Sequence, residues 1–182
     1  MRFSENRALA WAVLAAAVIF SISFSGGGAL KNTRVEVEQI FYEGSEGDGL
    51  CINRDLGVRA QEAYTLAAIA RKYLGEDAPQ VTGVEEASRQ LSEGQLISER
   101  AQANAALTSA VEDLYAALGE CTLSESDQIS ARSAYREIQS RADTISRDAY
   151  NARASAFNRT IEKFPASLLA SLTGVEPLEL FD

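Results

Sequence analysis

The stretch AYNARASAFNRTIEKFPASLLASLTG, residues 149–174, sets a series of aromatic and aliphatic side chains directly before a proline. Steps of three and four residues separate the members of this series, which are Tyr150, Ala154, Phe157, Ile161 and Phe164. Such steps place all of them on one face of an α-helix, which repeats every 3.6 residues or so. The stretch therefore predicts a long helix whose apolar face, the seam, is buried as far as Pro165.

Two asparagines flank this seam. Asn151 follows Tyr150, and Asn158 follows Phe157. A half-buried Asn can hydrogen-bond to a neighbouring helix and fix its register. We expect Asn151 and Asn158 to act in this way.

Pro165 limits the long helix. Proline has no N–H and its ring clashes with the preceding turn, so the helix must end near Phe164. Proline also suits the first turn of a new helix, and Gly174 suits the end of one. We expect a short helix over residues 165–173.

The apolar residues after Pro165 have two interpretations. The favoured one is a structural lid that folds under the helical domain and covers Val37, Ile40 and Phe41. The lid consists of Leu168, Leu169, Leu172, Gly174 and Phe181, together with Val175, Leu178 and Leu180. The alternative is that the leucines enter a membrane interface, although the acidic Glu176, Glu179 and Asp182 disfavour an anionic surface.

Apolar residues recur at helical spacing through the rest of the chain, and no stretch alternates with a period of two for long enough to form a sheet. The pattern predicts a first helix over 35–74, with a break at SEGDG (45–49). A short second helix runs from the capping pair Thr82 and Glu85 to Leu91. The third helix covers 97–118, and the fourth covers 125–164 and is capped by Ser124 and Asp127. Short loops between such helices favour antiparallel neighbours. The predicted fold class is all-α, an antiparallel up-and-down four-helix bundle with long first and last helices.

The first thirty residues form a separate unit. Arg2 and Arg7 precede an uncharged stretch from Ala8 to Leu30, which is long enough to span a bilayer as a helix. We expect residues 1–30 to be a single-pass membrane anchor and residues 31–182 to be the helical domain, facing out of the cytoplasm. The alternative is a cleaved signal peptide, because small residues occur at 23, 25, 27 and 29.

The composition argues against several function classes. The 182-residue chain has a net charge of −9, which repels nucleic acid, and contains no histidine. Without histidine, the usual base for a nucleophile and the usual bundle ligands for a metal or haem are missing. We therefore expect no enzyme activity, no metal, no cofactor and no nucleic-acid partner.

Cys51 and Cys121 are predicted to remain unpaired. In the four-helix arrangement, helical rise separates them by on the order of 30 Å, whereas a disulfide needs Cα atoms within about 7 Å. A three-helix arrangement would bring them together instead.

Residues 150–181 resemble the C-terminal signature of the LemA family. The matching features are Tyr150-Asn151, Phe157-Asn158, Phe164-Pro165, Gly174 and Phe181. IARKYLG at 69–75 is also similar to the end of the family's first helix, whereas the preceding region keeps only Arg54-Asp55-Leu56 of the family's pattern. The resemblance implies a membrane-anchored four-helix bundle and implies no reaction.

Two functions follow as expectations. The favoured one is a non-enzymatic, membrane-anchored helical bundle that binds a protein partner or acts as a scaffold in the cell envelope. The alternative is an exported soluble module that signal-peptide cleavage releases and that binds a small ligand or a protein.

Overall fold

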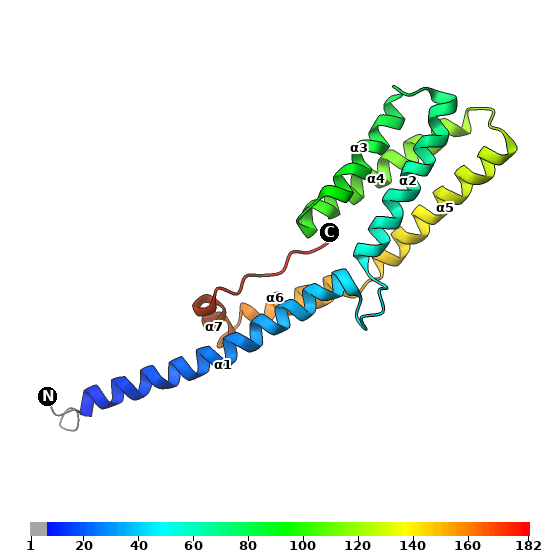
Figure 1. Ribbon diagram of the computed structural model, residues 1–182. Coiled ribbons are helices and arrows are strands. Elements are labelled where there is room, and N and C mark those ends of the chain that lie inside the picture. The colour runs from blue at the N-terminus through cyan, green and yellow to red at the C-terminus, as the bar shows by residue number, and fades with distance from the viewer. Residues whose placement is uncertain (1–6) are drawn as a thin grey trace. The chain divides into compact units, whose positions relative to one another are not determined.

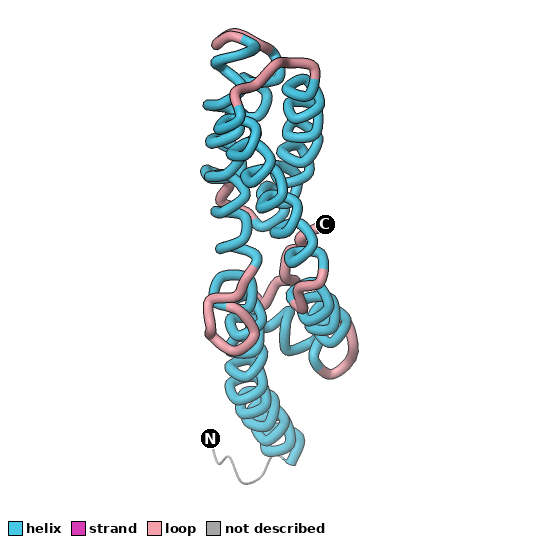
Figure 2. Tube along the Cα trace, turned by 90° about the vertical axis from the view of Figure 1, so that its right-hand side faces the viewer, coloured by secondary structure: helices cyan, strands magenta, loops and turns pink. Residues whose placement is uncertain are grey.

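The computed structural model describes residues 7–182, and within the first helix it describes side chains at positions 11, 13 and 14 and from 26 onward. Figure 1 labels the helices, and Figure 2 shows that loops join them and that the described residues form no strand. The all-α prediction is confirmed. The helices are α1 (Arg7–Glu43), α2 (Ile52–Leu74), α3 (Pro79–Glu93), α4 (Ile97–Gly119), α5 (Glu125–Ser146), α6 (Tyr150–Ile161) and α7 (Ala166–Thr173).

The chain divides into two compact units. Unit 1 comprises Met1–Glu38 and Ala152–Leu178, and unit 2 comprises Gln39–Asn151 and Glu179–Asp182. Helices α1 and α6 and the segment after α7 each contribute residues to both units.

In unit 2, α2 packs against α3, α4 and α5. One face of α2 is buried at steps of three and four residues, as its sequence predicts: Leu56, Ala60, Ala63, Ala67 and Ala70. Small alanine side chains let the neighbouring helices approach this face closely. Large residues of the other helices, such as Val84, Leu107 and Ile138, fill the core, and each contributes about 1.5–3 kcal/mol.

The prediction of one helix over 125–164 is wrong. Helix α5 ends at Ser146, where the N–H groups of Arg147 and Asp148 donate to carbonyls three residues earlier and tighten the last turn. The Asp148 carboxylate then accepts a hydrogen bond of 2.8 Å from the N–H of Tyr150, which starts α6. Helix α6 ends at Ile161, before Phe164 is reached.

Other boundaries follow local turn chemistry. The break before α2 is confirmed, and Gly44, Gly47 and Gly49 in it have positive φ. Ser124 caps α5 as predicted, since its Oγ accepts from the N–H of Asp127 at 3.2 Å. The predicted start of a helix at Thr82 is wrong, because α3 begins at Pro79, a residue that suits the first helical position.

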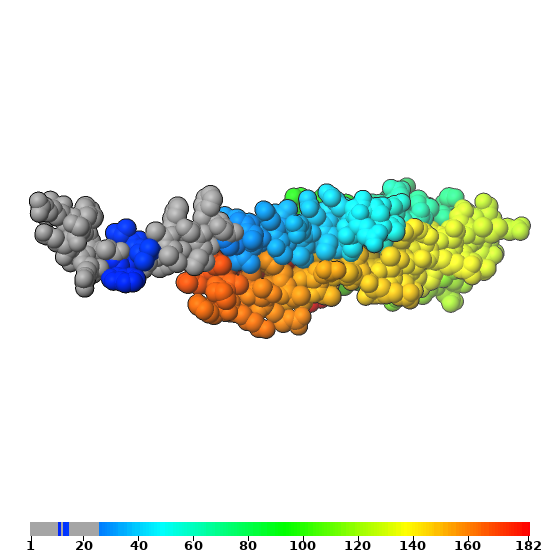
Figure 3. All heavy atoms as spheres, turned by 90° about the horizontal axis from the view of Figure 1, so that it is seen from below, coloured from blue at the N-terminus to red at the C-terminus, as the bar shows by residue number. Residues whose placement is uncertain are grey.

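The short helix after Pro165 is confirmed. Pro165 precedes α7, and Gly174 ends it in the left-handed conformation with φ of 68°. In unit 1, Figure 3 shows the orange residues of this region against the blue part of α1. Arg34 of α1 donates from Nε to the carbonyl of Glu176 at 3.1 Å.

The predicted anchor falls largely outside the described side chains. Residues 1–6 are not among the described residues, and neither are most side chains of 8–25. Within the described part of the chain, no helix meets the length and apolarity needed to cross a bilayer. The anchor stays a prediction.

Both cysteines are free in the structure. Cys51 is buried immediately before α2, where its Sγ donates to the carbonyl of Tyr42 at 3.1 Å, and Cys121 is half-buried after α4.

Candidate functional site

The predicted seam is buried over most of its length. Tyr150, Ala154, Phe157 and Ile161 are almost fully buried. Phe164 is 81% exposed, and its assignment to the seam is wrong, because α6 ends before the helical spacing could bring it round to the buried face.

Asn151 and Asn158 each bind both backbone polar groups of one residue near the C-terminus. In unit 2, Asn151 Nδ2 donates to the carbonyl of Phe181 at 2.6 Å, and the N–H of Phe181 donates to Asn151 Oδ1 at 2.8 Å. In unit 1, Asn158 makes the same pair with Leu178, at 2.9 and 2.8 Å. Their expected partner was a neighbouring helix, whereas the observed one is the extended segment 175–182, which we call the strap.

The spacing of the two asparagines explains the strap. Seven residues along a helix rise about 10 Å, and three residues along an extended segment also advance about 10 Å. Asn151 and Asn158 are therefore placed to bind Phe181 and Leu178, in the reverse order. The Tyr150 hydroxyl adds a further bond of 2.6 Å to the carbonyl of Glu179.

An aromatic cluster in unit 2 receives the end of the strap. The ring of Phe41 lies 5.4 Å from that of Tyr150 and 5.8 Å from that of Phe181. The Arg100 guanidinium lies 5.6 Å from the Phe41 ring centre, a cation–π distance. Phe181 thus covers Phe41, as the predicted lid required.

The leucines of α7 behave differently from the predicted lid. Leu168 is 52% and Leu172 is 56% exposed, so the expectation that they are buried is wrong, while Leu169 is half-buried. Gly174 serves only to end the helix.

A cavity of about 330 Å³ in unit 2 contains a buried arginine. Arg59 is fully buried, and its guanidinium donates to Asn104 Oδ1 and, at 2.8 Å, to Thr108 Oγ1. Its Nε has no partner, and no described carboxylate forms an ion pair with it. Burial lowers the pKa of Arg59, because desolvation disfavours the charged form.

The nearby carboxylate on α2 is already paired. Asp55, one helical turn before Arg59, is buried and binds Arg141 at 3.1 Å. Hydrogen bonds to Glu137 and to Asp55 raise the pKa of Arg141. The carboxylates of Asp148 and Asp182 line the Arg59 cavity, which therefore carries groups of both signs.

The apolar spacing of α2 contains one signal for the burial of Arg59. Arg59 lies three residues after Leu56 and four before Ala63, which places it on the buried face of α2.

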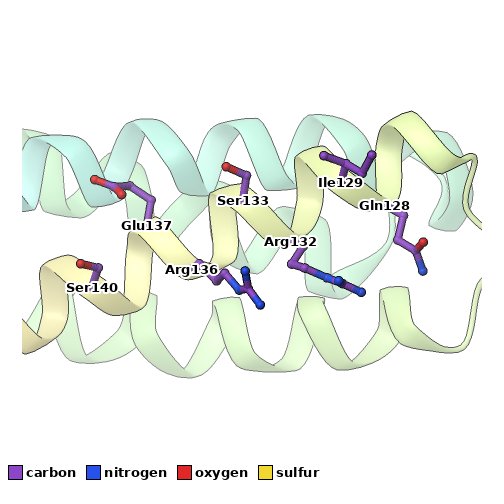
Figure 4. Close-up of a pocket in the computed structure, with 7 residues that line it drawn as sticks. All are labelled: Gln128, Ile129, Arg132, Ser133, Arg136, Glu137 and Ser140. Carbon is purple, nitrogen blue, oxygen red and sulfur yellow. The ribbon is translucent and has the colours of Figure 1, made fainter.

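A second hollow, of about 490 Å³, runs along α5, and we call it the α5 groove. Figure 4 shows its lining side chains, with Arg132 and Arg136 pointing in the same direction from the helix. Ile129 beside them is 64% exposed. The lining residues are Gln128, Ile129, Arg132, Ser133, Arg136, Glu137 and Ser140.

The described residues contain no group of three or more His, Cys, Asp or Glu side chains that could hold a metal ion.

Fold and site together define a class of all-α proteins in which asparagines on a late helix bind a C-terminal strap. The family model described as LemA family matches residues 51–182. The chain belongs to the LemA family. No curated protein and no solved structure matches it.

Proposed function

We propose that the protein is a membrane-anchored, non-enzymatic helical module that binds a protein partner, or serves as a scaffold, in the cell envelope. The uncharged run from Ala8 to Leu30 lies within α1 and supports a single-pass anchor. The short loops joining α2, α3, α4 and α5 support an up-and-down bundle as the exposed domain. The lack of histidine supports a role without catalysis.

The observation that carries the binding role is the α5 groove. Ile129 exposes an apolar side chain beside two exposed arginines, in a chain whose net charge is −9. Arginines beside an apolar anchor are typical of protein-binding surfaces. The partner that fits is a protein segment with an apolar side chain flanked by carboxylates.

Photo-cross-linking in native membranes tests this role. A photoreactive amino acid at Ser133 of the full chain should form a discrete adduct with a partner of defined mass. The double substitution Arg132→Glu and Arg136→Glu should lower the yield about tenfold, as the loss of roughly 1.4 kcal/mol of binding energy would.

Arg153→Glu with Arg159→Glu is the matched control, because both residues are exposed on α6 and the charge change is identical. Equal adduct yield in the two double variants would show that the groove does not bind the partner.

Membrane fractionation with N-terminal sequencing tests the anchor. An intact N-terminus in carbonate-washed membranes, and loss of the protein from membranes when residues 1–30 are deleted, would support it. A chain that starts near Leu30 in the supernatant would instead support the released module.

Binding of a small ligand is a second candidate, and the Arg59 cavity favours it. A fully buried guanidinium without a carboxylate partner is costly unless a ligand neutralises it. Succinate is a suitable probe. It should raise the melting temperature of the wild-type chain and have no effect on Arg59→Met, and absence of any wild-type shift would argue against this candidate.

A further inference from the structure

Two uncharged segments of the chain meet in unit 1. The first is Ala8–Leu30 of α1, between Arg7 and Lys31, and the second is Phe164–Val175, between Lys163 and Glu176. Gly26 and Gly27 form the α1 side of the contact. A Cβ on Gly26 would lie 2.7 Å from Leu169 Cδ1, and one on Gly27 would clash with Thr173 Cγ2.

The other side of α7 is apolar and largely exposed. Leu168 and Leu172 lie one turn apart on α7 and are 52% and 56% exposed, and Phe164, in the turn before the helix, is 81% exposed. Helix α7 buries only Ala170 fully. These three side chains, which we call the α7 face, are large apolar groups exposed on α7 and in the turn before it.

The place of the contact on α1 points to what covers this face. Gly26 and Gly27 lie three to four residues before the uncharged run ends at Leu30, which is about 5 Å at helical rise. If the run crosses a bilayer, those glycines lie just inside the hydrocarbon boundary. Amphipathic helices that lie on membranes bury their apolar face about 5–10 Å into the boundary between headgroups and acyl chains.

We propose that the α7 face is a second membrane contact, in which Phe164, Leu168 and Leu172 insert into the bilayer interface beside the anchor. This inference rests on the proposed anchor. The exposed Lys163 and Lys31 flank the two uncharged segments, where their ammonium groups can reach the lipid phosphates. Since Glu176 follows the segment, the contact is hydrophobic and does not require anionic lipid.

The single tryptophan of the chain allows a direct test. Trp11 lies in the uncharged run and is 69% exposed. The full-length protein is reconstituted in phosphatidylcholine vesicles whose acyl chains carry bromine, which quenches tryptophan fluorescence on contact. Quenching of Trp11 reports the anchor alone.

The α7 face is probed in a Trp11→Phe background. Leu172→Trp places the only tryptophan on the face, and because Leu172 is exposed the change leaves the packing intact. We expect loss of most of its fluorescence and a blue-shifted emission, with bromine near the headgroup end of the acyl chain quenching best. Ile129→Trp in the same background, at an exposed apolar position that the inference does not assign to the membrane, should stay unquenched.

The outcomes separate the two proposals. Quenching both at 172 and at Trp11 supports the inference. Quenching at 172 with an unquenched Trp11 overturns the anchor, and with it the place of the contact beside an anchor, while the α7 face would still contact lipid. An unquenched tryptophan at 172 overturns the inference. If its emission is then blue-shifted only at high protein density, a second copy of the chain covers the face instead.

Discussion

A carboxamide side chain carries a donor and an acceptor in one plane, as an extended peptide residue does. This is why Asn151 can bind both the N–H and the C=O of Phe181, and Asn158 those of Leu178. Aspartate has the same shape but lacks the donor. The binding of the strap to α6 therefore depends on the chemical identity of these side chains as well as on their size.

Substituting Asn158→Asp should remove one of the two bonds and set a carboxylate against the Leu178 carbonyl. We expect the free energy of unfolding to fall by about 1–3 kcal/mol, the cost of a broken half-buried hydrogen bond. Chemical denaturation measures this loss, and amide exchange over residues 175–182 should accelerate. The exposed Asn32→Asp is the control, and equal behaviour of both variants would contradict a role for Asn158 in the strap.

Replacing Arg59 with methionine should stabilise the protein. The folded state lowers the pKa of Arg59, so it disfavours the charged form at every pH below that lowered pKa. Methionine removes this cost, and cavity water can bind the freed oxygens of Asn104 and Thr108. We expect a gain of about 1 kcal/mol or more.

The gain should be constant between about pH 5 and pH 9, because arginine stays charged in the unfolded chain throughout that range. Urea unfolding at several pH values measures it. Arg147→Met, at an exposed position, should change little. A loss of stability in Arg59→Met would mean that the hydrogen bonds of Arg59 outweigh its desolvation.

At the scale of elements, the contact of α7 with α1 depends on Gly27 more than on Gly28. Gly27→Ala should clash with the branched side chain of Thr173 and cost about 1–3 kcal/mol. Gly28→Ala meets nothing within 4 Å and should gain up to about 1 kcal/mol from helix propensity. Amide exchange over α7 distinguishes the two, and equal exchange would show that the helices do not approach closely at Gly27.

A polar clamp joins the end of α2 to the start of α5. Asp127 accepts from Lys72 at 2.9 Å and from the Tyr73 hydroxyl at 2.7 Å. The hydrogen bond from Lys72 is the largest cause that lowers the pKa of Asp127, and the bond from Tyr73 lowers it further. A carboxyl with a lowered folded pKa contributes stability above its unfolded pKa, and that contribution is lost as the pH falls through the folded value.

Asp127→Asn should therefore lower the melting temperature at pH 7 and reduce the loss of stability below about pH 4. Thermal melts from pH 7 to acid conditions check both effects. Asp77→Asn, in the exposed loop before α3, is the control. If the melting temperatures of wild type and Asp127→Asn fall in parallel as the pH is lowered, the clamp is not the source of the loss of stability in acid.

Most elements could be predicted because their signals are local. The apolar spacing of Leu56 to Ala70 and of Tyr150 to Ile161 shows which faces are buried, and Ser124 and Gly174 mark helix ends. The sequence also contains a signal for the break between α5 and α6, because the Asp148 side chain can cap the start of α6. The apolar spacing continues on both sides of the break, so spacing alone predicts one uninterrupted helix.

The features that sequence reasoning missed depend on tertiary partners. Whether Leu168 and Leu172 are buried depends on what α7 meets, and the glycines of α1 that receive it are distant in sequence. The partners of Asn151 and Asn158 likewise lie twenty or more residues away, in an extended segment without a periodic pattern.

At the scale of the whole molecule, the strap contributes to both compact units. Residues up to Leu178 belong to unit 1, and Glu179–Asp182 belong to unit 2. In unit 1, removing residues 175–182 breaks the hydrogen bonds of Asn158 with Leu178. In unit 2, it breaks those of Tyr150 and Asn151 with the strap and the contact of Phe41 with Phe181.

Truncation after Gly174 should therefore destabilise both units. Loss of the buried Phe181 alone should cost about 3–5 kcal/mol. Denaturant unfolding of the full-length and truncated chains in detergent measures the total, and amide exchange near Arg34 and Phe41 reports each unit. Asp182→Ala, which changes only an exposed residue of the strap, should unfold like the wild type.

The position of the strap has a consequence for biosynthesis. A ribosome adds Leu178 and Phe181 after every residue that they bind, so α6 emerges with its asparagines unpaired and Phe41 uncovered. The strap contacts in both units must then wait until residues 175–182 have been translated. A chain whose synthesis stops early would keep these surfaces open, and proteases that remove incompletely folded proteins could distinguish it from a finished one.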